Sequence, residues 1–170
     1  MKTFKLILVL AVSIMAFSCG SDDDNTPAGP TLTNELLAGT YNLNFYNSTD
    51  VVVTTVSGGT VTTTITEVGD TFGGSNVTFN ANGTFTSSFQ FRITETTTLQ
   101  GNDPVVETYI ISDENSGSYT VNDANQTITI DGELNDVILF NATDLRLQYN
   151  ENGVDGDESY TYTEELRFTR

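Results

Sequence analysis

The sequence predicts an all-β domain, an antiparallel up-and-down β-barrel of about eight to ten strands, with a two-sheet β-sandwich as the alternative. Three observations support this fold class. From Gly39 onward, apolar and polar residues alternate with a period of two. Thr, Val, Ile, Phe and Tyr dominate these segments, and Gly, Asn and Asp interrupt them at short intervals. Since no long helical pattern separates the segments, their apolar faces can be buried only in a barrel or a sandwich.

The expected elements follow in chain order. Residues 34–38 can form one helical turn. The expected strands are 40–46, 51–68 with a hairpin at 58–59, 76–94 with a turn at 80–83, 105–112, 118–122, 127–131, 137–140, 145–149 and 160–168. The clearest pattern lies in 84–94, where one face consists of Phe85, Ser87, Phe89, Phe91 and Ile93. The other face is polar, so we expect one side of this strand in the core and the other in water.

The first and last strands distinguish a barrel from a sandwich. In the first, Tyr41, Leu43 and Phe45 alternate with asparagines. In the last, one face carries Tyr160, Tyr162, Leu166 and Phe168. If these two strands pair, the sheet closes on itself and loses its exposed edges.

The N-terminus has the pattern of a secretory leader. Lys2 and Lys5 precede an apolar run from Leu6 to Phe17, which is shorter than the roughly 20 residues that span a bilayer. The segment that ends at Cys19 resembles the lipobox of bacterial lipoproteins. This resemblance implies that residues 1–18 are removed and that Cys19 is acylated, which anchors the protein to a membrane. The alternative is an ordinary signal peptide with an incidental cysteine.

The residues after Cys19 suggest a location. Ser21, Asp22, Asp23 and Asp24 resemble the export signal of Bacteroidota lipoproteins, which implies the outer face of the outer membrane. We expect residues 19–33 to be an acidic, flexible tether. Residues 34–170 then form the folded domain.

The composition excludes several kinds of chemistry. The chain has no His or Trp, and every Lys and Met precedes Cys19. Ser-His or Cys-His catalysis, Schiff-base chemistry and imidazole-bound zinc are therefore excluded. The 23 acidic side chains face only four arginines after the leader, so nucleic acid is not an expected partner. A carboxylate pair, as in a glycosidase, has no supporting motif here, and we expect no enzyme.

Four segments together resemble the lipocalin-like domain of Bacteroidota lipoproteins: 36–43 (LLAGTYNL), 77–85 (VTFNANGTF), 117–121 (GSYTV) and 166–170 (LRFTR). The resemblance implies a cup-shaped barrel. It also implies that Gly39 opens the first strand, that Tyr41 stands where the family usually has Trp, and that Arg170 packs across this ring to close the barrel.

The resemblance further implies an interior that either holds a small hydrophobic or amphipathic ligand or is filled with side chains. The residues expected to line it are Phe85, Phe89, Phe91, Tyr109, Tyr149, Tyr160 and Tyr162. Tyrosine suits a pocket wall because it has an apolar ring and a polar tip. The alternative is that these aromatic residues are ordinary core.

The segment 150–158 collects oxygen ligands around two glycines. Asp155, Asp157 and Glu158 are candidate ligands of a weak calcium site, but the spacing does not match an EF-hand. We favour a solvated hairpin turn. The expected cofactor is therefore none beyond the covalent lipid.

Three functions remain open at this point. The first is a surface lipoprotein that binds a small hydrophobic or amphipathic molecule, which predicts an interior pocket. The second is a non-enzymatic interaction or structural lipoprotein with a filled core, acting through its loops and acidic exterior. The third is a carboxylate-based enzyme, which predicts two facing carboxylates with one raised pKa.

Overall fold

The computed structural model of the protein describes residues 31–170. The expected leader, Cys19, the acidic run 21–24 and most of the expected tether lie outside the described residues. Within residues 31–170, no helix has the length and hydropathy of a membrane span.

Residues 31–170 fold into one antiparallel sheet preceded by a single helical turn. The elements are α2 (Asn34–Leu37), β1 (Gly39–Val56), β2 (Gly59–Asp70), β3 (Asn76–Phe79), β4 (Thr84–Leu99), β5 (Val105–Asn122), β6 (Thr127–Ile130), β7 (Glu133–Phe140), β8 (Asp144–Asp155) and β9 (Glu158–Thr169). The sheet has nine strands in the order β2-β1-β3-β4-β5-β6-β7-β8-β9, with β2–β4 and β1–β9 pairs in addition. The all-β prediction and the helical turn near residue 34 are confirmed.

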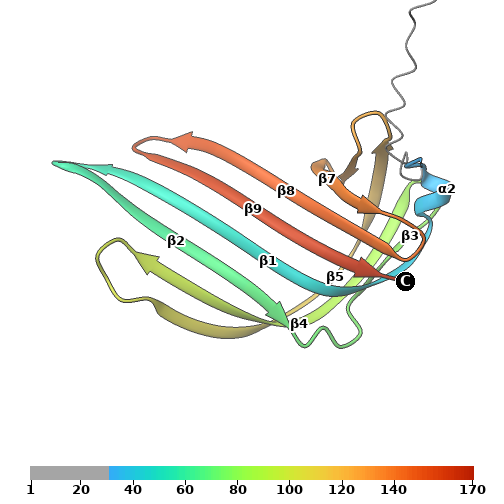
Figure 1. Cartoon of the computed structure of the whole chain (residues 1–170), viewed down its shortest axis with the longest axis horizontal. Helices are drawn as coiled ribbons and strands as arrows, with labels where there is room; N and C mark the ends of the chain where they lie inside the picture. Colours follow the sequence, from blue (N-terminus) through green and yellow to red (C-terminus); the bar gives the residue numbers. More distant parts are fainter. Residues whose placement is uncertain (1–30) are drawn as a thin grey trace, which may run out of the picture.

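The sheet closes into a ring because its first and last strands pair. β1 and β9 are in register from Asn42 opposite Thr169 to Thr54 opposite Glu158, which confirms the closure expected if they paired. β2 and β3 share one place in the ring: each lies between β1 and β4, one after the other. Figure 1 shows the resulting strongly curved sheet, with β1, β2, β8 and β9 running side by side.

One end of the ring is closed and densely packed, and we call it the base. It holds the cluster of buried apolar side chains: Leu32, Leu37, Tyr41, Leu43, Val77, Phe79, Phe85, Phe91, Ile93, Tyr119, Ile128, Val137, Phe140, Leu145, Leu147 and Phe168. α2 packs against this end (Figure 1). There the Tyr41 hydroxyl donates to the Leu37 carbonyl over 3.0 Å. Burial of this cluster is the main driving force for the fold.

The other end is open on one side, because β6 and β7 are short. β5 pairs with β6 only over residues 119–122, and β8 pairs with β7 only over residues 145–149. Residues 105–118 of β5 and 150–155 of β8 therefore each have a strand partner on one side alone. The long strands project beyond the base as a curved wall (Figure 1).

Several sequence predictions about strand boundaries were wrong. β5 continues through residues 113–117, which were expected to separate two strands, because β4 offers an unbroken row of partners there. β1 likewise continues through residues 47–50, where both β2 and β9 pair with it.

The alternation of Tyr41, Leu43 and Phe45 does not carry Phe45 to the face of the other two residues. The β1–β9 register shifts between Leu43 and Phe45, so Leu43 lies opposite Phe168, whereas Phe45 lies opposite Arg167 and Tyr46 opposite Leu166. Such a bulge reverses which side chains face the interior. Phe45 therefore lies on the outer face, where its ring centroid is 4.0 Å from the Arg167 guanidinium carbon.

Candidate functional site

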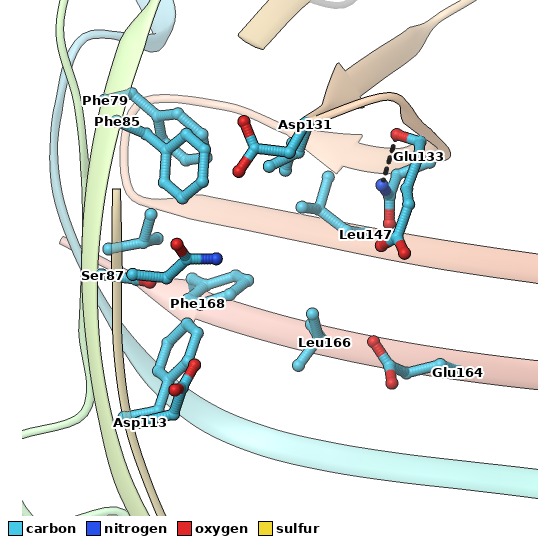
Figure 2. Close-up of a pocket in the computed structure, with 15 residues that line it drawn as sticks. Phe79, Phe85, Ser87, Asp113, Asp131, Glu133, Leu147, Glu164, Leu166 and Phe168 are labelled. Carbon is cyan, nitrogen blue, oxygen red and sulfur yellow. Dashed lines mark hydrogen bonds between the residues drawn. The ribbon is translucent and has the colours of Figure 1, made fainter. Parts of the chain in front are cut away.

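A cavity with a mostly apolar lining lies inside the sheet, above the base. This apolar hollow has a volume of about 310 Å³. Its apolar lining consists of Val77, Phe79, Phe85, Phe89, Ile130, Leu147, Leu166 and Phe168, and its polar lining of Ser87, Asp113, Asn115, Asp131, Glu133, Asn135 and Glu164. Figure 2 shows the phenylalanines of β3, β4 and β9 on one side and Leu147 and Leu166 on the other.

Two local features keep this space open. Ser87 interrupts the inward row of phenylalanines on β4, and its small side chain leaves room between Phe85 and Phe89. On the opposite wall, β7 begins at Glu133 and pairs with β8 only from Asn135 onward, although β8 itself continues to Asp155. This wall therefore stops at Glu133 and Asn135. The hollow therefore has an apolar floor and an opening toward solvent.

Carboxylates surround the opening of the apolar hollow. Asp113 comes from β5, Glu133 from β7 and Glu164 from β9, while Asp131 belongs to the turn between β6 and β7 (Figure 2). Asp131 accepts a 2.9 Å hydrogen bond from the Ser118 amide. It fits there because Gly117 has no side chain: a Cβ at that position would lie 2.0 Å from Asp131 Oδ1.

Glu164 connects the apolar hollow to two neighbouring cavities. The tyrosine hollow, about 360 Å³, is lined by Glu133, Asn135, Tyr149, Glu151, Tyr162 and Glu164. The side hollow, about 270 Å³, is lined by Leu43, Tyr46, Glu67, Phe89, Phe91, Ile93, Ile111, Asp113, Glu164 and Leu166. Glu164 lines all three cavities, so it stands at the boundary between the apolar floor and the polar wall.

Burial raises the pKa of Glu164 above its ordinary value. The Tyr162 hydroxyl donates a 2.7 Å hydrogen bond to Glu164 Oε2 and opposes this shift, while the charges of Glu133 and Glu67 add to it. The raised pKa means that the negative charge on Glu164 is poorly compensated inside the protein.

The pKa of Glu67, on β2, shifts in the opposite direction. Tyr46 and Ser48 donate to its Oε2 over 2.8 and 2.7 Å, and the Tyr109 hydroxyl donates to its Oε1. Burial alone would raise its pKa, but these three donors outweigh burial and lower it. Among the described residues, Glu67 therefore accepts hydrogen bonds from three side chains, whereas Glu164 accepts one, from Tyr162.

The four arginines of the described residues all lie away from these three hollows. Arg92 forms an ion pair with Asp70 on the outer face, and Arg146 and Arg167 both bind Glu165 there. None of the four lines any of the three hollows. The inner wall is therefore acidic without a compensating base.

The fourth arginine belongs to the base. The Arg170 guanidinium lies 4.9 Å from the Tyr41 ring centroid and donates to the carbonyls of Ala142 and Ala38 over 2.8 and 3.2 Å. Gly39 is left-handed, with a φ of +148°, and a Cβ there would lie 3.0 Å from Arg170 Nη1. The three residues expected at the closed end, Gly39, Tyr41 and Arg170, thus lie in contact.

The seven aromatic residues expected inside divide among different places. Phe85 and Phe89 line the apolar hollow, Phe91 lines the side hollow, and Tyr149 and Tyr162 line the tyrosine hollow. Tyr109 and Tyr160 lie farther along the projecting strands, where they donate to Glu67 and Glu151. Tyr160 packs over Gly153, where a Cβ would come within 2.6 Å of its ring.

The candidate calcium ligands lie at the β8–β9 hairpin. Asp155 and Glu158 are paired strand residues, and Asp157 belongs to the two-residue turn between them. Within residues 31–170, no three acidic, histidine or cysteine side chains are grouped so as to hold a metal ion. Most of segment 150–158 is strand rather than loop.

Sequence reasoning missed the inward carboxylates. Strand parity could have identified Glu164, because it falls between Tyr162 and Leu166 on the face that was expected to point inward. The same parity places Asp113 in line with Tyr109 and Ile111. Glu133 had no such signal, because its strand was expected to begin at residue 137.

Comparisons with known proteins identify no relative: no family model, curated protein or solved structure matches this chain.

Proposed function

We propose that this protein is a membrane-anchored, surface-exposed lipoprotein whose half-open barrel binds or carries a small hydrophobic or amphipathic molecule. The apolar hollow carries the binding part of this proposal. Its volume of about 310 Å³ lies at the small end of the roughly 300–1,000 Å³ that ligand pockets occupy. The anchor and the location rest on Cys19 and residues 21–24.

The architecture supports a ligand that approaches from one side. Arg170 and α2 block the base, where the guanidinium covers Tyr41. The opposite end is open between the one-sided edges of β5 and β8. An apolar group would enter there and replace water against Phe89, Leu166 and Phe168. Removing that apolar surface from water supplies the binding free energy.

A carboxylate-based enzyme has one observation in its favour. Glu67 and Glu164 flank Ser48 from β2 and β9, and the pKa of Glu67 is lowered while that of Glu164 is raised. Acid and base pairs in hydrolases show such a separation. However, both oxygens of Glu67 already accept hydrogen bonds from Tyr46, Ser48 and Tyr109, so this carboxylate serves the wall rather than a substrate. Binding remains the proposed function.

A docking function is the second candidate. The part of β5 that pairs with β4 alone carries Val105, Val106 and Ile110, whose exposed fractions are 58%, 61% and 68%. Exposed apolar side chains beside a free strand edge are typical of a surface that binds another chain. Glu107 and Asp113 on the same edge oppose pairing with a further strand, as charges on edge strands generally do.

The binding proposal is tested by filling the hollow. Ser87→Leu places an apolar side chain inside it, whereas Ser88→Leu makes the same change on the next residue, which points to the outer face. We expect Ser87→Leu to weaken binding of a neutral lipophilic dye, followed by its fluorescence, by about tenfold or more. Ser88→Leu should bind the dye as the parent protein does. Equal affinities for the two variants, or no binding to the parent protein, would contradict the proposal.

The anchor is tested separately. Cells supplied with radiolabelled palmitate should incorporate label into the parent protein and not into the Cys19→Ala variant. Label in both proteins, or in neither, would remove the lipid anchor from the proposal.

A further inference from the structure

We infer that the ligand of this barrel carries a positive charge: it is an amphiphile with an apolar chain and an ammonium head. This inference rests on the proposed function and specifies its ligand. The chain would occupy the apolar hollow, and the head would lie at Glu164, where that hollow meets the tyrosine hollow.

The first argument is the separation of charge across the sheet. The three connected hollows are lined by six carboxylates and no arginine: Glu67, Asp113, Asp131, Glu133, Glu151 and Glu164. The only other basic residues of the chain, Lys2 and Lys5, precede the described part. An anionic head group, such as that of a fatty acid, would be repelled by this wall, whereas a cation would be attracted.

The second argument is a buried oxygen without a partner. Asp50 lies opposite Tyr162 on the inner face of the β1–β9 pair. Its Oδ1 is shielded from solvent and accepts no hydrogen bond from the described residues. Asp50 itself lines none of the three hollows, but it lies across the strand pair from Tyr162, which lines the tyrosine hollow, so a cation bound beside Tyr162 would lower the cost of shielding this oxygen.

The third argument is the aromatic lining. The rings of Tyr149 and Tyr162 lie 6.0 Å apart in the tyrosine hollow, and their hydroxyls donate to Glu151 and Glu164. Aromatic faces combined with carboxylates are the usual environment of alkylammonium groups in proteins. A bare metal ion fits less well, because residues 31–170 contain no group of three acids placed to ligate one.

The experiment compares three ligands that share a ten-carbon chain and differ in head group. Decyltrimethylammonium, decanol and decanoate are titrated into the full-length protein by calorimetry, below their micelle concentrations, at neutral pH and low salt. We expect the ammonium compound to bind at least about tenfold more tightly than decanol, with decanoate weakest. Raising the salt concentration should reduce this preference.

Variants then locate the head group. Glu164→Gln should lower the affinity for the ammonium compound about tenfold and the affinity for decanol much less. Glu165→Gln is the matched control, since it removes the same charge from the neighbouring residue, which binds Arg146 and Arg167 outside. Glu133→Gln provides a second inner variant, and circular dichroism reports whether each variant is folded.

The outcomes separate this inference from the function it rests on. If decanol binds as tightly as the ammonium compound, or if Glu164→Gln and Glu165→Gln behave alike, the inference is wrong and the binding function stands. If none of the three compounds binds, both are wrong.

Discussion

The base and the projecting wall are built from the same strands, but they differ in the side chains that face inward and in how far the sheet encloses them. On β9, the inward residues Phe168 and Leu166 belong to the base, and Glu164, Tyr162 and Tyr160 follow on the wall. The alternation in and out does not change between the two regions. What changes is the covering: the ring is complete at the base, whereas β6 and β7 leave the wall uncovered on one side.

This difference shows how one sheet can provide both stability and a site. Residues inside a complete ring have neighbours on all sides, so they are apolar or, like Ser75, hydrogen-bonded within the protein. Residues on the wall reach solvent, so they can keep carboxylates and phenols that hydrogen-bond to one another, as Tyr160, Tyr149 and Glu151 do. Removing side chains in the two regions should therefore have very different effects on stability.

The largest expected effect comes from truncating the centre of the base. Phe79 is 1% exposed and packs against the rings of Tyr41, Phe85 and Tyr119. Phe79→Ala should lower the free energy of unfolding by about 3–5 kcal/mol, as the loss of a buried phenylalanine generally does. Tyr149→Ala on the wall should cost about 1 kcal/mol or less. Urea unfolding measures both, and similar losses would show that the two regions are not distinct.

A smaller effect is expected at the closure of the base. Arg170→Ala removes the cation over the Tyr41 ring and the donors to Ala142 and Ala38. We expect a loss of roughly 1–2 kcal/mol, because a cation–π contact contributes about 0.5–2 kcal/mol and this group is partly exposed. Thermal unfolding measures it. Arg170→Lys, which keeps the charge but not the planar fork, should recover only part of the loss; full recovery would mean that charge alone closes the base.

The smallest effect concerns how the stability of the folded protein depends on pH through Glu164 on the wall. Because the folded-state pKa of Glu164 is raised, the folded protein binds this proton more tightly than the unfolded chain does. Its contribution to stability is therefore present at acidic pH and is lost as the pH rises from about 4.5 through the raised value. The groups that face it are Tyr162, Glu133, Glu67 and Tyr46.

Glu164→Gln should remove this loss, so that the variant melts on the order of a few degrees higher than the parent at pH 7 and at a similar temperature near pH 4.5. Glu165→Gln should do the reverse at neutral pH. Burial would raise the pKa of Glu165, but Arg167 and Arg146 outweigh burial and lower it, so the variant loses a stabilising charge. Parallel melting curves for the two variants would show that the wall does not bury Glu164 as described.

The amino-acid pattern alone determined the fold class and much of the base. Alternation over residues 84–94 placed Phe85, Phe89, Phe91 and Ile93 on one face, as observed, because strand geometry forces successive side chains to opposite sides. The short helical turn before β1 was equally local. Such features depend only on neighbours in the chain.

The tertiary structure decided the site. A bulge between Leu43 and Phe45 moved Phe45 outward and Tyr46 inward, which the alternation around it did not indicate. Glu133 and Glu164 meet at one hollow although they lie on different strands, because the ring closes through β1 and β9 while β6 and β7 stop short. Convergence of distant residues depends on strand pairing and lengths across the whole sheet, and no local pattern contains that information.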